Sequence, residues 1–463
     1  MRFSDLDGAH VGVWGAGREI VSFAAQLRRR LPSARIEAIA FDGEAPAGVA
    51  EALGAPGARV VSGAGIVAAL GGCEVVVRSP GVSIHREELA ALRAAGVPST
   101  TATALWLAEH GSAGVVGVTG TKGKSTTAAL IFHLLCAAGL PARLAGNIGV
   151  PALDLLDADL SEVAVVELSS YQTADLEQGP QVAVVTNLYN EHADWHGSHE
   201  RYRAEKLRLL ALPGVQTCVL PAHDALLGAL RPRGVSLLFF GAAEGWHVPP
   251  GGGLALAGET VLAPGELPLR GEHNALNLCA ALTALAALGV AAPVLPGGLA
   301  GFEPLPHRLE VVAERDGVSW VNDSISTTPE SALAALASFP GRRVVLIAGG
   351  QDRGQEFEEL AAVLAARAAG PEPATLIALP STGARLLVAA RAAGLPAEHA
   401  HDCADLASAV ALAASLATAG AVVLLSPAAP SYDHYRSFEE RGERFRSLAR
   451  EAAEKTRAAA RAL

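Results

Sequence analysis

The stretch Gly117–Thr127 combines residue types that bind phosphate groups. It follows a hydrophobic run, so the sequence predicts a strand, a glycine-rich loop and a helix start in that order. Loop amides and a helix N-terminus attract phosphate oxygens, Lys124 adds a positive charge, and Ser125 can hold Mg²⁺. The motif is imperfect because Val118 stands where its first glycine belongs, and a plain glycine-rich turn is the alternative. We predict a nucleoside triphosphate site with these ligands: Gly120, Thr121, Lys122, Gly123, Lys124, Ser125 and Thr126.

Carboxylate and imidazole groups follow two later predicted strands. Glu167 ends one of them, which places a carboxylate at the edge of the sheet beside the phosphate loop, where a magnesium ligand is needed. The alternative is a glutamate in solvent. His192 lies in a stretch dense in carboxylates and imidazoles after the next strand, which favours a metal or phosphate role over a core histidine. His196 and His199 are weaker candidates that could simply face water.

Further candidates lie near both ends of the chain. A predicted strand ends at Trp14 and leads into a G-x-G turn, which resembles a dinucleotide-binding turn without its third glycine and indicates a nucleoside diphosphate site. An ordinary strand-to-helix turn remains open there. Arg308 and Asp323 flank a predicted strand and could grip ATP, or could be loop residues. From the residues alone, Tyr202–Lys206 is typical of a solvated charged helix face.

The elements that position these residues alternate between strand and helix, which predicts an α/β fold with mostly parallel sheets. The length of 463 residues predicts three domains. We place them at residues 1–110, 111–300 and 301–463. Strands of the second are expected at 115–118, 163–167 and 182–186, and those of the third at 318–321, 344–347, 375–379 and 421–425.

Composition excludes several classes of protein. The net charge of −11 without a polybasic cluster argues against a nucleic-acid partner. Five scattered cysteines without C-x-x-C spacing argue against disulfides or a zinc site and favour a reducing, cytoplasmic compartment. Two uncharged stretches, 276–295 and 406–430, are broken by Gly and Pro, so we expect buried helices rather than membrane spans. No heptad repeat stands out, and we expect a monomer.

Together these motifs resemble the Mur ligases of peptidoglycan synthesis over essentially the whole chain, and among them those that add glutamate to UDP-N-acetylmuramoyl-L-alanine. The resemblance implies a Rossmann-like N-terminal UDP-binding domain, a central ATPase domain and a Rossmann-like C-terminal domain for the amino acid. It also implies that ATP converts the alanyl carboxylate into an acyl phosphate, which the amine of glutamate attacks. The segments that carry the resemblance are 117–127, 146–149, 167–170, 187–192, 202–206, 271–277, 307–308, 322–324 and 426–438.

The resemblance also implies roles for single residues. The catalytic group is Lys124, Glu167, His192 and Lys206. Ser125, Glu167, His192 and a carbamylated Lys206 would hold Mg²⁺. ATP would further contact Asn274 and Asn277 at adenine, Arg308 at the phosphates and Asp323 at the ribose. The UDP substrate would contact Gly15, Gly17, Asp42, Ser79, Pro80, Gly81 and Asn147. Glutamate would contact Thr327, Arg353, Ser431, Tyr432 and Phe438.

The chain departs from common glutamate-adding members near the amino-acid pocket. Those members have Lys-Ala-Thr-Asn where this chain has Ile325–Thr328, and they tend to be aliphatic where Tyr432 stands. The departures favour L-glutamate as the substrate, with a separate epimerase to invert the product. Addition of D-glutamate is the alternative. More distant alternatives are a nucleotide-dependent binding protein without ligation and a folylpolyglutamate or cyanophycin-type ligase.

Overall fold

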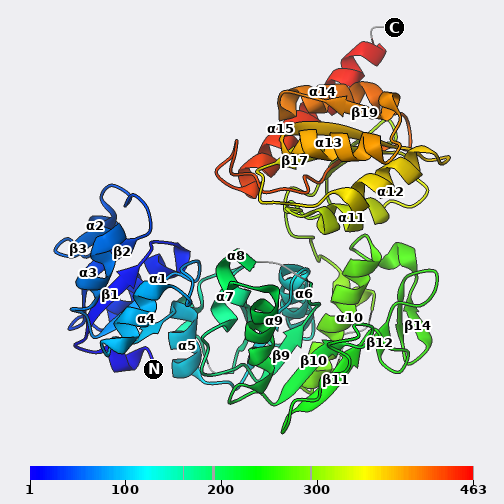
Figure 1. Ribbon diagram of the computed structural model, residues 1–463. Coiled ribbons are helices and arrows are strands. Elements are labelled where there is room, and N and C mark those ends of the chain that lie inside the picture. The colour runs from blue at the N-terminus through cyan, green and yellow to red at the C-terminus, as the bar shows by residue number, and fades with distance from the viewer. Residues whose placement is uncertain (160, 190–192, 292–294, 462–463) are drawn as a thin grey trace. The chain divides into compact units, whose positions relative to one another are not determined.

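The computed structural model describes residues 1–159, 161–189, 193–291 and 295–461 (Figure 1). The chain forms two compact units: residues 1–267 with 274–302, and residues 268–273 with 303–463. Each unit is built on parallel sheets with helices packed against them, so the predicted α/β class is confirmed. The first unit holds two large sheets. The division into three domains stays a prediction.

The first sheet has the order β3-β2-β1-β4-β5, and all its strands are parallel. The strand order reverses between β1 and β4, which is where open α/β sheets bind ligands. The strands are β1 (His10–Trp14), β2 (Arg35–Phe41), β3 (Arg59–Ser62), β4 (Val75–Arg78) and β5 (Ser99–Thr100). The helices are α1 (Arg18–Arg30), α2 (Val49–Ala52), α3 (Ile66–Leu70), α4 (Glu87–Ala94) and α5 (Ala102–His110).

The second sheet has the order β11-β10-β9-β6-β8-β7 and is also parallel. Its register pairs Val118 of β6 with Glu167 of β8, which sets that carboxylate beside the start of the phosphate loop. The strands are β6 (Val115–Thr119), β7 (Ala142–Gly146), β8 (Val163–Glu167), β9 (Val182–Val185), β10 (Thr217–Pro221) and β11 (Ser236–Phe240). The helices are α6 (Lys124–Ala137), α7 (Ser170–Thr173), α8 (Ala193–His196), α9 (His199–Leu207) and α10 (Glu272–Ala287). A small antiparallel sheet follows: β12 (Trp246–His247), β13 (Leu254–Leu256) and β14 (Glu259–Leu262).

Buried polar contacts join the two large sheets of the first unit. Arg78, fully buried at the end of β4, pairs with Asp175 at 2.5 Å and donates to the carbonyl of Val82 at 2.9 Å. Ser22 and Gln26 of α1 donate to Asp154. One cluster of buried apolar side chains runs through both halves. Because removing one partner of a largely buried ion pair is costly, these contacts fix the first sheet against the second.

The second unit has the order β15-β16-β20-β17-β18-β19, with β15 antiparallel to β16 and the other strands parallel. The strands are β15 (Glu310–Arg315), β16 (Val318–Asn322), β17 (Val344–Gly350), β18 (Ala374–Ser381), β19 (Ala400–Asp402) and β20 (Val422–Leu425). The helices are α11 (Pro329–Ala337), α12 (Glu358–Ala368), α13 (Thr382–Ala392), α14 (Leu406–Leu416) and α15 (Phe438–Arg461). Among the described residues no helix is both long and apolar enough to cross a membrane.

A buried arginine holds together the loops at one end of the sheet of the second unit. Arg441 of α15 donates to Ser324 after β16 at 2.9 Å and to the carbonyl of Ala429 after β20 at 3.1 Å. Burial lowers the pKa of its guanidinium to about 10, so it remains charged at neutral pH. These loops carry the residues expected to contact glutamate.

Candidate active site

The phosphate loop is held open by side-chain and backbone contacts from the end of β9. Asn187 accepts from the amide of Thr121 with its carbonyl, at 3.0 Å, and from the amide of Lys122 with its side-chain oxygen, at 2.8 Å. Helix α6 begins at Lys124, whose ammonium reaches the carbonyl of Thr121 at 2.8 Å. The loop amides and this helix N-terminus together form an anion site.

Two glycines of the loop stand where a side chain does not fit. Gly120 has φ +142°, and a Cβ there would lie 1.9 Å from Oγ1 of Thr186. Gly123 has φ +79°, and a Cβ there would lie 2.3 Å from Oδ1 of Asn277. Any substitution must therefore move the loop.

We expect Gly120→Ala to weaken ATP binding about tenfold or more, since the strained backbone alone costs about 1–2 kcal/mol and the contact with Thr186 adds to it. Isothermal titration with a non-hydrolysable ATP analogue measures the effect. Gly265→Ala is the matched control, because nothing lies within 4 Å of its added Cβ. Equal affinity of Gly120→Ala and wild type would contradict the assignment of this loop.

Two buried groups next to the loop fit a divalent cation. Glu167 is 1% exposed; its Oε1 accepts from Asn147 at 3.0 Å, and its Oε2 has no partner in the described part of the chain. A buried carboxylate oxygen left unpaired is costly, and a hard cation would satisfy it. Ser125 is buried at the start of α6. The residues therefore fit Mg²⁺, while His192 lies outside the described residues.

Lys206 is buried, contrary to the solvated helix face that its segment suggested. Its exposed fraction is 1%; its ammonium donates to the carbonyl of Gly120 at 2.6 Å and lies 5.0 Å from the ring centre of Tyr202. The buried Tyr202 in turn shares a 2.8 Å hydrogen bond with Thr121. Helix α9 thus presents its lysine to the phosphate loop, which places Lys206 in the site.

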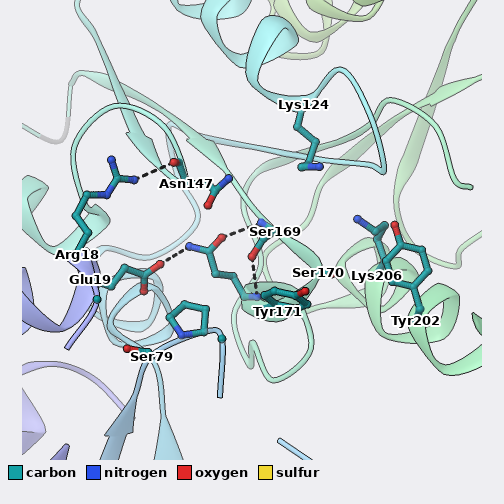
Figure 2. Close-up of a pocket in the computed structure, with 14 residues that line it drawn as sticks. Arg18, Glu19, Ser79, Lys124, Asn147, Ser169, Ser170, Tyr171, Tyr202 and Lys206 are labelled. Atoms are coloured by element: carbon teal, nitrogen blue, oxygen red, sulfur yellow. Dashed lines mark hydrogen bonds between the residues drawn. The ribbon is translucent and has the colours of Figure 1, made fainter. Parts of the chain in front are cut away.

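A cavity of about 420 Å³ brings the predicted groups together (Figure 2). Lys124 and Lys206 lie on one side of it, and Arg18, Glu19 and Ser79 lie on the other. Its lining is Gly17, Arg18, Glu19, Ser79, Pro80, Gly81, Lys124, Asn147, Ser169, Ser170, Tyr171, Gln172, Tyr202 and Lys206. Gly15 packs against Ser79, so closely that a Cβ added to Gly15 would lie 2.6 Å from the hydroxyl oxygen of Ser79. Asp42 lies elsewhere, in a second cavity of about 530 Å³ lined also by Gly81, Ser83, His85, Arg86, Tyr171, Trp195 and Gly197.

Seven residues that line this cavity were not among the predicted site residues: Arg18, Glu19, Ser169, Ser170, Tyr171, Gln172 and Tyr202. The guanidinium of Arg18 donates to the carbonyls of Gly146 at 2.6 Å and Asn147 at 2.9 Å, and so holds the loop that carries Asn147 (Figure 2). Glu19 accepts from Gln172 at 2.5 Å, and burial raises the pKa of its carboxyl. The only signal for the first two was their place directly after the G-x-G turn, at the start of α1.

The expected adenine residues lie in the first unit and the expected ribose residue in the second. Asn277 donates to Asn274 at 3.1 Å, and both are buried on α10 close to Gly123. Asp323, at the end of β16, accepts from Ser426 at 2.8 Å. Burial raises the pKa of Asp323 to about 6, and the nearby Arg308 acts in the opposite direction.

Asp323 should make stability fall as pH rises. Its folded-state pKa of about 6 lies above the usual 3.8, so the folded state holds the proton more tightly than the unfolded chain. Between about pH 4 and pH 6 this group should remove about 3 kcal/mol from the free energy of unfolding. Urea unfolding of wild type and Asp323→Asn across this range measures it. We expect the stability of the variant relative to wild type to increase with pH; a constant difference would contradict the assignment.

The residues expected to contact glutamate lie in loops that follow strands of the sheet in the second unit. Ser431 is 1% exposed, and its hydroxyl has no partner in the described part of the chain. Tyr432 is 58% exposed, and the guanidinium of Arg353 lies 5.6 Å from its ring centre. Phe438, at the start of α15, accepts from Ser324 through its carbonyl at 2.8 Å. Thr327 lies in the loop between β16 and α11.

Solved structures share this fold. A MurF ligase from Thermotoga maritima in complex with ADP aligns with a TM-score of 0.61 at 20% identity, over 98% of this chain and 97% of that chain. The UDP-N-acetylmuramate-alanine ligase MurC from the same organism aligns with a TM-score of 0.56 at 17% sequence identity. That alignment covers 97% of this chain and 100% of the MurC chain. At these identities the likeness concerns the fold alone.

Sequence comparison identifies closer relatives. Residues 118–285 match the Mur ligase middle domain, and residues 307–429 match the Mur ligase, glutamate ligase domain. A UDP-N-acetylmuramoyl-L-alanine–L-glutamate ligase of Xanthomonas euvesicatoria pv. vesicatoria is 42% identical over 97% of each chain. One of the same name from a Micromonospora species is 44% identical over 98% of this chain and 99% of its own. With such identity over almost its whole length, the chain belongs to the Mur ligase family.

Proposed function

We propose that the chain is an ATP-dependent ligase that joins L-glutamate to the alanyl carboxyl group of UDP-N-acetylmuramoyl-L-alanine, with release of ADP and phosphate. The names of relatives 42–44% identical over nearly full length support the choice of substrates. The observation that carries the proposal is the single cavity in which Lys124 and Lys206 face Gly17, Ser79 and Asn147. Such an arrangement suits transfer of a phosphoryl group to an acceptor held opposite the phosphate loop.

The reaction needs a leaving group, because a carboxylate does not accept an amine directly. The alanyl carboxylate attacks the γ-phosphorus of ATP, the bond from that phosphorus to the bridging oxygen breaks, and ADP leaves with the bond's electron pair. Lys124 neutralises the charge that builds on the phosphoryl oxygens. Mg²⁺, when bound, would add Lewis-acid stabilisation, with Ser125 and Glu167 as ligands and His192 and a carbamylated Lys206 at a second ion. The amine of glutamate then attacks the acyl phosphate, the C–N bond forms, and phosphate leaves with the C–O electron pair.

Each proposed domain then has a main task. Residues 1–110 would bind the UDP end, including Gly15 and Asp42. Residues 111–300 would bind ATP, with Asn274 and Asn277 at the adenine. Residues 301–463 would bring glutamate, with Arg308 and Asp323 completing the nucleotide contacts. The ADP bound to the Thermotoga MurF of the same fold supports ATP as the nucleotide.

The proposed glutamate pocket has a different set of charges from the common glutamate-adding members. The segment 325–328 has no cation, and among the described residues Arg353 forms no ion pair, whereas the nearby Arg385 is paired with Asp352 at 2.7 Å. Arg353 is thus available to bind a carboxylate of the substrate, and the buried hydroxyl of Ser431 is available to bind a second polar group of the substrate. The ring of Tyr432 lies against the guanidinium of Arg353. Enantiomer choice depends on where two carboxylates and one amine are held together.

The test supplies ATP, Mg²⁺ and UDP-N-acetylmuramoyl-L-alanine with L-glutamate or D-glutamate, and records phosphate release and product mass. We expect turnover with L-glutamate alone, and a following epimerase reaction that inverts the new centre. Turnover with D-glutamate alone would contradict the proposal and make the 325–328 segment a tolerated variation. We also propose that the protein acts in the cytoplasm as a monomer; gel filtration tests the second point.

A further inference from the structure

Two segments far apart in the sequence meet beside the active-site cavity. One follows β4 and contains Gly81 and Ser83; the other contains α8 with Trp195. The hydroxyl of Ser83 donates to the carbonyl of Trp195 at 2.7 Å, and Nε1 of the Trp195 indole donates to the carbonyl of Gly81 at 3.0 Å. Trp195 also stacks on Tyr171 with ring centres 4.7 Å apart. The loop of residues 79–86, here named the acceptor loop because Ser79, Pro80 and Gly81 are expected to contact the UDP substrate, is therefore tied to the segment that leads into α9.

A second tie lies next to the first and consists of one carboxylate between two imidazoles. Nε2 of His85 lies 2.7 Å from Oε1 of Glu205, and Nδ1 of His196 lies 2.6 Å from Oε2 of the same residue. The side chains are 29%, 13% and 0% exposed in the order His85, Glu205, His196. Of the two interpretations that the sequence left open for His196, exposure to water is therefore wrong. Hydrogen bonds to a carboxylate are stronger than neutral ones, and more so where water is excluded.

This cluster lies between the acceptor loop and the phosphate loop. On one side, Gly81 lines both cavities and is held by Trp195. On the other, Glu205 directly precedes Lys206, whose ammonium contacts Gly120 at 2.6 Å. Through α9, the loop expected to bind the acceptor is thus connected to the lysine expected to act at the γ-phosphate.

We propose that His85, Trp195, His196 and Glu205 form a positioning device, here named the acceptor clasp, which sets the acceptor loop relative to Lys206 and the phosphate loop. The inference rests on the proposed function. Phosphoryl transfer requires the attacking carboxylate oxygen within about 3–3.5 Å of phosphorus, and a displacement of about 1 Å can cost about a hundredfold in rate. A clasp that spans the cavity would suppress such displacements.

Two histidines and a glutamate are also ligands that zinc accepts, and one ligand atom of each lies within 4.8 Å of the others. The nitrogen–oxygen separations of 2.6 and 2.7 Å are hydrogen-bond distances. Two ligands of a tetrahedral zinc ion would stand about 3.3 Å apart, given zinc–ligand bonds of about 2.0–2.1 Å. Nε2 of His196 also has no partner in the described part of the chain, whereas metal-bound histidines normally have one. These observations favour the clasp over a metal site.

The test compares Glu205→Ala, His85→Ala and their double variant with wild type, and adds Glu205→Gln and Trp195→Phe as milder changes. Trp195→Phe keeps an aromatic ring but loses the donor to Gly81. Glu200→Gln, on the exposed surface of the same helix, is the matched control. Steady-state ligation is measured against acceptor and ATP separately, together with melting temperature and zinc content by mass spectrometry.

We expect Glu205→Ala to lower kcat/KM for UDP-N-acetylmuramoyl-L-alanine about tenfold or more, with KM for ATP within about twofold of wild type. The kcat/KM values of Glu205→Gln and Trp195→Phe should lie between those of Glu205→Ala and wild type, and Glu200→Gln should match wild type. The double variant should be no less active than Glu205→Ala, because His85 and Glu205 share one contact. Additive losses, a rise of KM for ATP as large as that for the acceptor, or one zinc ion per chain would overturn the clasp. Absence of wild-type turnover would overturn the proposed function, and the positioning role with it.

Discussion

We expect Glu167→Gln to lower kcat for ligation about a thousandfold while leaving the free energy of unfolding unchanged or higher. The activity falls because the amide cannot replace an anionic ligand of Mg²⁺, and the cation contributes several kcal/mol of charge stabilisation in the transition state. Stability is retained, because the glutamine keeps an oxygen that can accept from Asn147. In the wild-type chain Asn147 donates to Oε1 of Glu167 at 3.0 Å. The variant also removes a buried carboxyl oxygen that has no partner in the described part of the chain.

The opposite signs of these two effects make the prediction specific. Steady-state kinetics over a range of Mg²⁺ concentrations should show a higher half-saturating concentration in the variant, and chemical denaturation measures the stability. Glu162→Gln is the matched control, because Glu162 precedes the same strand β8 but pairs with the exposed Arg143 at 2.6 Å. Near-normal turnover with an unchanged Mg²⁺ requirement would remove Glu167 from the proposed metal site.

Lys206→Ala should abolish measurable ligation, with a loss of about a thousandfold or more and native secondary structure retained. The proposed carbamate supplies an oxygen ligand at the second Mg²⁺, and alanine supplies none. Lys206→Arg distinguishes this role from that of a plain cation, because arginine keeps the positive charge but does not form the carbamate. We expect both variants to be equally inactive, as measured by phosphate release and product mass.

Circular dichroism and binding of an ATP analogue serve as the controls for Lys206, since the ammonium also donates to Gly120 in the phosphate loop. Wild type assayed without dissolved carbon dioxide should lose activity and recover it on addition of bicarbonate. Substantial turnover of Lys206→Arg, or activity independent of bicarbonate, would leave Lys206 as a cation that positions the loop and would exclude the carbamate.

Local signals in the sequence predicted the phosphate loop and Glu167. A glycine-rich loop between strand and helix has few alternative structures, and a carboxylate that ends a strand next to this loop must lie at the same sheet edge; the pairing of Val118 with Glu167 follows from this. The seven strands expected in the second and third domains have ends within three residues of those observed, whereas others, among them β7, β10 and β19, were not predicted.

Residues whose role depends on distant contacts could not be predicted from the sequence. The charged pattern around Lys206 is typical of solvated helices, and its burial arises only when α9 packs over the phosphate loop. Arg18 acquires its role from carbonyls about 130 positions later, at Gly146 and Asn147, to which no local pattern points. For the same reason His196 looked exposed: its partner Glu205 lies nine residues on, across a turn.

The buried pair of Arg78 and Asp175 has a consequence for recombination between related enzymes. A chimera that exchanges residues 1–110 alone inherits one half of this pair and the donors Ser22 and Gln26, and must meet a foreign partner for each. If the new partner has no carboxylate opposite Arg78, a buried guanidinium is left without a counter-charge, which strongly lowers the free energy of unfolding. The segment to exchange, if the specificity for the UDP substrate is to be transferred, is therefore larger than residues 1–110. It also includes the segments around Asp154, Asp175 and Trp195–Glu205, because these contact residues 1–110.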